Sequence, residues 1–169
     1  MPPPLRHAAH LDLSYRPLAS EDYGFTEALY LSTRAEELAL SGWPEAQRRQ
    51  FLMQQHRAQH LHYQRHYPDA EWLVVERAGT PVGRLYIEEW RDQFRIIDIS
   101  LMPAARGGGI GTAILRDTLD WAKAHAKSAS IHVEKGNPAR ALYERLGFTL
   151  VEDKGVYDLM KWSPPANSA

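Results

Sequence analysis

The sequence predicts an α/β fold in which helices flank one mixed sheet, and three observations support this class. Short apolar runs alternate with longer helical patterns along the chain. The run FRIIDISLM (94–102) is apolar on both faces at several positions, as expected of a central strand. A glycine-rich stretch, RGGGIGT (106–112), then leads from this strand into an amphipathic helical pattern.

The predicted elements follow the order β-α-α-β-β-β-α-β-α-β-β. Alternation of apolar and polar residues predicts the first strand, and Ser20 with the acids after it predicts a helix start. Asn137 can cap a short helix that has Pro138 at its first position and ends at Gly147. The predicted strands are 11–18, 71–77, 82–90, 94–102, 128–135 and a final hairpin over 148–162 turning at 153–155, and the longer helices are 20–33, 45–62 and 110–126.

Composition narrows the class of protein. The 169 residues suit one domain, expected over 11–163, with residues 1–10 and 164–169 as loose ends. A formal net charge of -1 provides no global basic field for nucleic acid. The absence of cysteine excludes disulfides, thiolate metal sites and a cysteine nucleophile, and favours a cytoplasmic location. No apolar run approaches the roughly 18 residues of a membrane span, so we expect no membrane partner.

The helix over 45–62 and the residues after it carry four histidines in QQHRAQHLHYQRH. Two pairs lie four residues apart, but no acidic residue or cysteine accompanies them, so a solvated histidine-rich helix is favoured and no metal is expected. Several aromatic residues of the helices and middle strands are candidates for an acceptor pocket, with core packing as the alternative: Trp43, Tyr63, Tyr67, Tyr86 and Trp90.

The glycine stretch predicts an anion site. A strand that passes through glycines into a helix presents free backbone N–H groups at the positive end of the helix dipole, which favours phosphate. Arg106 adds a full charge and several donors. A Walker loop is excluded because Gly111 is followed by Thr112 rather than lysine, and a Rossmann fingerprint fails on the spacing of its third glycine.

The pattern that fits is R-x-x-G-x-G, formed by Arg106, Gly109 and Gly111. It resembles the pyrophosphate loop of the GCN5-related N-acetyltransferases. L-x-P-x-x-R precedes the loop from Leu101, and NPARALYERLGF (137–148) follows with the family's asparagine and tyrosine spacing. The order of elements also matches that family across roughly residues 11 to 162.

The resemblance implies a GNAT-like acyl-CoA N-acyltransferase fold with acetyl-CoA as cosubstrate and no metal. The loop backbone would bind the pyrophosphate, and Leu101 and Met102 would offer backbone groups to the pantetheine arm as an added strand would. The thioester would lie where the third central strand separates from the next. The implied CoA-binding residues are Leu101, Met102, Arg106, Gly107, Gly108, Gly109, Ile110, Gly111, Thr112, Asn137 and Tyr143.

Acetyl transfer to an amine requires a proton acceptor for the amine and a proton donor for the leaving thiolate. Tyr143 matches the family's usual general acid, and the Met102 N–H is a candidate donor to the thioester oxyanion. Asp98 is the candidate base, because a carboxylate in an apolar strand should be paired or functional. The position where many family members have a glutamate is Arg95, so Glu88, Glu89 or a water relay remain alternatives.

The sequence therefore predicts an acetyl-CoA-dependent N-acetyltransferase that modifies a primary amine by direct attack in a ternary complex. The alternative is a non-catalytic acyl-CoA binding or sensing module on the same fold. The resemblance leaves a homodimer open. The identity of the amine and strict use of acetyl-CoA are not encoded in any motif of the chain.

Overall fold

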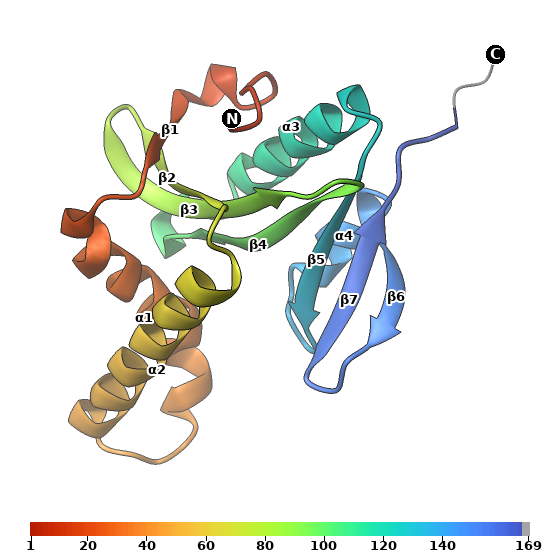
Figure 1. The fold of residues 1–169 in the computed structure, drawn as a ribbon. Helices are drawn as coiled ribbons and strands as arrows, with labels where there is room; N and C mark the ends of the chain where they lie inside the picture. The colour runs from red at the N-terminus through yellow and green to blue at the C-terminus, as the bar shows by residue number, and fades with distance from the viewer. Residues whose placement is uncertain (167–169) are drawn as a thin grey trace.

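The computed structural model describes residues 1–166 of the chain (Figure 1). The predicted order of elements is confirmed. The strands are β1 (Leu13–Pro17), β2 (Glu71–Arg77), β3 (Thr80–Glu89), β4 (Gln93–Leu101), β5 (Ser128–Glu134), β6 (Thr149–Asp153) and β7 (Tyr157–Trp162). The α-helices are α1 (Tyr23–Ala39), α2 (Glu45–His66), α3 (Ile110–Ala124) and α4 (Arg140–Arg145).

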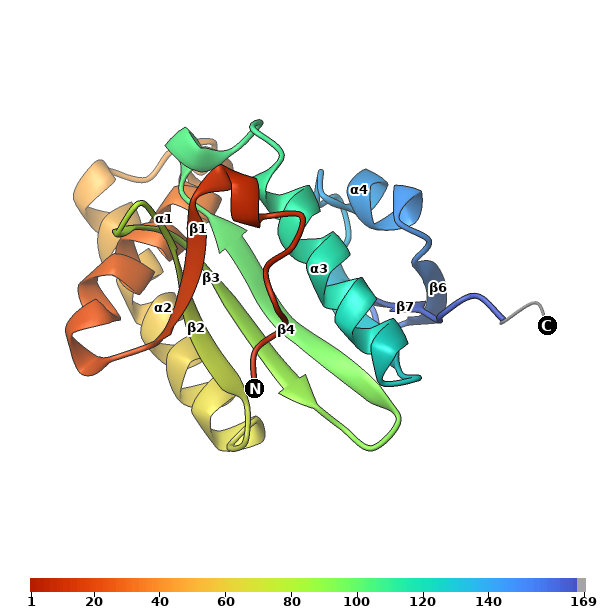
Figure 2. The same ribbon diagram turned by 90° about the horizontal axis from the view of Figure 1, so that it is seen from above.

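The seven strands form one mixed sheet in the order β1-β2-β3-β4-β5-β7-β6. Only β4 and β5 are parallel neighbours, and α3 makes the connection between them that parallel strands require. The β2–β3 loop contains Ala78 and Gly79, both with positive φ (49° and 83°), as a two-residue type I′ turn needs. Helices α1 and α2 lie together on one face of the sheet and α3 lies on the other (Figures 1 and 2).

The main core lies between α3 and the sheet. The predicted apolar positions of α3 are buried, with Ile114 and Leu115 at 0% and 1% exposure. They pack with Leu85, Ile96 and Ile131 of the central strands. Each such side chain contributes about 1.5–3 kcal/mol by leaving water, so this face fixes the position of α3 and of the loop that begins it.

Helix α1 runs to Ala39, six residues beyond the predicted end, because Arg34–Ala39 (RAEELA) are strong helix formers and no breaker occurs before Gly42. Helix α2 buries only Leu52 and His56. His56 departs from the expected solvated helix: its Nε2 lies 3.1 Å from Thr26 Oγ1, and burial lowers its pKa to about 4. It is therefore a neutral packing residue beneath α1. No helix among the described residues is long and apolar enough to cross a bilayer.

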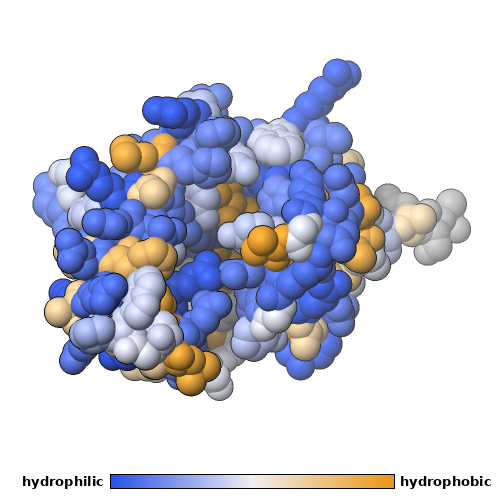
Figure 3. All heavy atoms as spheres, turned by 90° about the horizontal axis from the view of Figure 1, so that it is seen from below, coloured by the Kyte–Doolittle hydropathy of each residue, from blue (hydrophilic) through white to orange (hydrophobic). Residues whose placement is uncertain are grey.

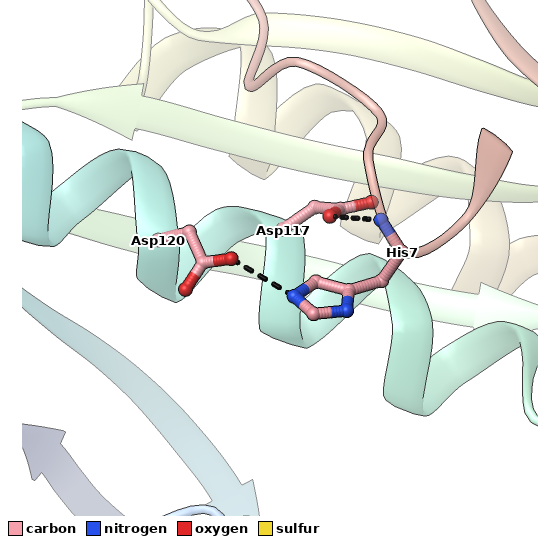
Figure 4. A group of neighbouring side chains, drawn as sticks. All are labelled: His7, Asp117 and Asp120. Carbon is pink, nitrogen blue, oxygen red and sulfur yellow. Dashed lines mark hydrogen bonds and ion pairs between the residues drawn. The ribbon is translucent and has the colours of Figure 1, made fainter.

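The N-terminal segment, expected to be loose, lies along α3 (Figure 4). The buried carboxylate of Asp117 accepts the backbone N–H groups of His7 and Ala8, at 2.7 and 3.1 Å. The His7 ring meets Asp120 at 2.9 Å on the surface. Both Asp117 oxygens are thus occupied by backbone donors, so this cluster holds the segment in place. The predicted C-terminal tail, 164–169, lies in part outside the described residues.

Replacing Asp117 by Ala should lower the free energy of unfolding by about 2 kcal/mol or more, since two backbone N–H groups lose a charged acceptor. Urea denaturation measures this loss, and amide hydrogen exchange should rise around His7 and Ala8. Asp120→Ala is the matched control, because its pair with His7 is half-exposed and is worth under about 1 kcal/mol. Equal losses in the two variants would contradict the role of Asp117.

Candidate functional site

The central feature of the site is the separation of β4 from β5. Residues Gln93–Ile96 of β4 pair with residues Ser128–Ile131 of β5, and the pairing between the two strands stops there. In the β3–β4 register, Ile87 faces Ile96 and Tyr86 faces Asp98, so Ile97 is an extra residue, a β-bulge. A bulge bends its strand and increases the local twist. Beyond it, no described strand pairs with the edge of β4 that faces β5.

Backbone alternation decides which groups of β4 face this gap. The Met102 N–H donates to the Val82 carbonyl of β3 at 2.8 Å. The backbone groups of Leu101 therefore point to the opposite edge, toward β5. The expectation that the Met102 N–H serves as an oxyanion donor is wrong in this arrangement, because that group already completes the pairing with β3. The Leu101 N–H remains the group that this edge offers for strand-like addition, because the Leu101 carbonyl accepts a hydrogen bond from Arg106 Nε.

The glycine loop lies between the end of β4 and the start of α3. Gly107 and Gly109 have φ of 80° and 84°, a conformation that other residues adopt at a cost. Gly109 precedes the first residue of α3, and no side chain caps this helix. Its first N–H groups are therefore free for an anion. Arg106 is exposed and donates from Nε to the Leu101 carbonyl at 3.0 Å, so its remaining donors lie at the mouth of the gap.

Tyr143 lies on α4, which begins at Arg140, three residues after the predicted cap Asn137, and ends before Gly147 as predicted. The Asn137 side chain accepts the Ala139 N–H at 2.9 Å. Tyr143 is 4% exposed and packs edge-on against Phe148. Burial, with a smaller effect from Asp98, raises the pKa of its hydroxyl well above the ordinary value. The Tyr143 hydroxyl therefore carries its proton at neutral pH and holds it more tightly than an exposed tyrosine does.

Asp98 is not a free carboxylate. Its Oδ2 accepts hydrogen bonds from Arg84 Nη2 at 2.8 Å and from the Tyr63 hydroxyl at 3.3 Å, and its Oδ1 accepts one from Ser100. The side chains of Arg84 and Asp98 are 4% and 13% exposed, so this is a nearly buried ion pair. A buried ion pair of this kind needs both partners, because either charge alone would be costly at this burial.

Glu88 and Glu89, the alternative candidates for the base, also interact with other side chains. Glu88 Oε1 accepts the Trp90 indole N–H at 3.0 Å, while its Oε2 is buried without a partner among the described residues. Glu89 lies at the surface in an ion pair with Lys127 at 2.7 Å. None of the three candidate carboxylates is therefore an isolated base facing the gap.

Some of the predicted aromatic residues gather near Asp98. Tyr63 and Tyr86 line a cavity of about 120 Å³ between α2 and the sheet, together with Leu18, His60, Gln64, Trp72 and Arg84. Trp43 instead packs on Phe51 at the far end of α2, and Trp90 lies beside Arg95. Sequence analysis missed Arg84, although a charge in the apolar run VGRLYI was a usable signal.

The molecule is hollowed on the side of α1 and α2. Figure 3 shows this hollow between the helical part and the part that carries the C-terminus, with hydrophilic residues at its centre. One ion pair joins the two parts: Arg34 of α1 and Glu134 at the end of β5 lie 2.8 Å apart.

Comparison with known proteins identifies the class. A family model described as the acetyltransferase (GNAT) family matches residues 21–148, and the chain belongs to this family. The mycothiol acetyltransferase of Corynebacterium glutamicum is 35% identical over 95 residues, which are 54% of this chain and 32% of that protein. The chain thus aligns with only about a third of that relative.

Two solved structures share the fold. The PaiA N-acetyltransferase of Thermoplasma acidophilum, in complex with coenzyme A, superposes with a TM-score of 0.68 at 15% identity, covering 90% of this chain and 99% of the other. A GNAT family acetyltransferase of Elizabethkingia anophelis with acetyl-CoA bound gives 0.57 at 14% identity, over 90% and 99%. At these identities the likeness concerns the fold.

Gly83→Ala tests the close approach of β3 to the end of β4. A Cβ at Gly83 would overlap the Ser100 carbonyl oxygen and lie 2.7 Å from Leu101 Cδ2. We expect a loss of about 1–3 kcal/mol in unfolding free energy and faster exchange of the Met102 amide. Gly24→Ala is the control, since nothing lies within 4 Å of its added Cβ in α1. An unchanged Met102 amide would contradict the packing described.

Proposed function

We propose that the protein is an N-acetyltransferase that moves the acetyl group of acetyl-CoA to a primary amine by direct attack in a ternary complex. The observation that carries this proposal is the unpaired edge of β4 beside an uncapped helix N-terminus. Membership of the acetyltransferase family supports it, as do family members of the same fold solved with coenzyme A or acetyl-CoA.

Acetyl-CoA would enter the gap between β4 and β5. Its pyrophosphate would accept hydrogen bonds from the backbone N–H groups at the start of α3, with added charge from Arg106. Its pantetheine amides would pair with the free edge of β4 at Leu101. The proposed binding residues are Leu101, Arg106, Gly107, Gly108, Gly109, Ile110, Gly111, Thr112 and Asn137.

In the proposed reaction the neutral amine nitrogen attacks the thioester carbon, the C–N bond forms and the C–S bond breaks. Tyr143 donates its proton to the departing thiolate. An alkyl amine with a pKa of about 10.4 is neutral in roughly one molecule per few thousand at pH 7, so its proton must also be removed. Because Asp98 accepts hydrogen bonds from Arg84, Tyr63 and Ser100, we propose that a relay of water molecules carries this proton to bulk solvent, from which Tyr143 regains its own proton. Asp98 Oδ1 keeps a lone pair that can orient such a water.

The second candidate function is a non-catalytic acyl-CoA binding module. The ion pairs of Asp98 with Arg84 and of Glu89 with Lys127 favour it, because they leave Glu88 as the one candidate base of the three that forms no ion pair among the described residues. The two functions differ in one readout. An enzyme releases coenzyme A thiol when an amine is supplied, whereas a binding module holds acetyl-CoA without turnover.

Tyr143→Phe should lower kcat by about 100-fold or more while leaving acetyl-CoA affinity nearly unchanged, because only the proton donor is removed. Thiol release over a panel of amines gives kcat, and calorimetry gives the affinity. Tyr15→Phe is a matched control, since Tyr15 on β1 is also buried with a raised pKa. Undiminished turnover in Tyr143→Phe would remove the assigned acid, and thiol release from no amine would favour the binding module.

A further inference from the structure

Arg95 of β4 is a buried cation without an anionic partner. It is 7% exposed, and its Nε donates to Ser130 Oγ at 2.9 Å. Its Nη1 lies 3.2 Å from His132 Nδ1, and its guanidinium carbon lies 4.6 Å from the centre of the Trp90 ring. No carboxylate oxygen of the described residues comes within ion-pair distance, whereas the equally buried Arg84 has Asp98 at 2.8 Å.

The neutral neighbours of Arg95 satisfy hydrogen bonds but leave its charge uncompensated. A buried ionic group without a counter-charge is expensive. Glu88 is the cross-strand partner of Arg95 in the β3–β4 register. It accepts the Trp90 indole N–H and forms no ion pair with Arg95 among the described residues. Such uncompensated charges gather at functional sites, where a ligand supplies the missing partner.

His132 adds a second donor to the same group. Arginine can only donate, so His132 Nδ1 accepts the hydrogen bond from Arg95 and the ring proton lies on Nε2. Burial, followed by the charge of Arg95, lowers the pKa of His132 and keeps the ring neutral. Arg95 and His132 together offer N–H donors and one positive charge, and a planar carboxylate matches this combination.

The register places Arg95 on the face of the sheet that the amine would approach. Arg95 is paired with Glu88 and Asp98 with Tyr86, and these two β3 residues share one face because they are two positions apart. Tyr63 of α2 reaches Asp98 on that face. Arg95 lies within the last paired segment of β4, immediately before the strand separates from β5.

Two acids of this face form ion pairs with arginines of the chain. Asp98 pairs with Arg84, and Glu134 pairs with Arg34 at 2.8 Å. Glu88 keeps one oxygen without a partner among the described residues, but a polyamine or aminoglycoside that approached it would also meet the guanidinium of Arg95, its cross-strand partner, which forms no ion pair among those residues. We propose that Arg95 binds a carboxylate of the acceptor, so that the substrates are amines that also carry a carboxylate, such as amino acids. This inference rests on the proposed acetyltransferase function.

The test compares acceptors that differ only in the carboxylate. Thiol release is measured with L-amino acids, their C-terminal amides, and spermidine. We expect the preferred amino acid to exceed its amide by about 10- to 100-fold in kcat/KM, mainly through KM, and Arg95→Gln to abolish this difference. Arg95→Lys should restore part of it. Arg77→Gln, at the exposed end of β2, controls for loss of one charge.

Two outcomes would overturn the inference. In the first outcome, the amides or spermidine are acetylated with the same kcat/KM as the amino acids. This result would contradict the carboxylate site and leave the proposed acetyltransferase function intact. In the second outcome, Arg95→Gln lowers kcat/KM equally for each amino acid and for its amide, and the double variant Arg95→Gln/Glu88→Gln regains the lost activity. This result would mean that Arg95 only balances the charge of Glu88.

A final measurement separates this inference from the proposed function. If no amine is acetylated, calorimetry of N-acetyl-amino acids with the CoA-loaded protein decides. If the N-acetyl-amino acids bind to the unchanged protein and not to Arg95→Gln, the carboxylate site is supported even without catalysis. If they do not bind to the unchanged protein, the carboxylate site is contradicted.

Discussion

The separation of β4 from β5 is the constraint on which the rest of the molecule depends. Parallel strands that paired along their full length would leave no edge for a ligand. Here pairing stops after Ile96 and Ile131, and the bulge at Ile97 turns the remainder of β4 away. The packing of α3 on the sheet then fixes the glycine loop beside the opening, and α4 brings Tyr143 to it.

The charges around the opening divide the site into two halves. On the side of α3, free N–H groups and Arg106 form an electropositive entrance suited to phosphate. On the side of α1 and α2, the buried Arg84 pairs with Asp98 and the half-buried Arg34 pairs with Glu134, while Arg95 has no such partner among the described residues. The carboxylate of Asp98 is thus held by Arg84, Tyr63 and Ser100. The proposed proton relay through water and the proposed recognition of a carboxylate on the acceptor both rest on this arrangement of charges.

The order of strands and helices could be predicted from the sequence, because each element carries its own periodicity and its own breakers. The glycine loop was equally visible, since glycines at 107–109 and 111 have few structural explanations. The hydrogen-bond and ion-pair partners of the site residues could not be predicted from the sequence. The pairing of Asp98 with Arg84 depends on a register that shifts at Ile97, and nothing local in the sequence marks that bulge. The engagement of the Met102 N–H and the burial of His56 likewise arise from contacts between distant segments.

Calorimetric titration with acetyl-CoA tests the central claim most directly. The account predicts one site of about micromolar affinity, lost when Gly109 is changed to Glu. Gly79→Glu is the control, because Gly79 in the β2–β3 turn has the same positive φ as Gly109 (83° and 84°) and lies in open space. The Gly79→Glu variant should bind acetyl-CoA with the same affinity as the unchanged protein. Absence of binding by the folded protein, or equal loss in both variants, would contradict the assignment of the loop as a CoA pyrophosphate site.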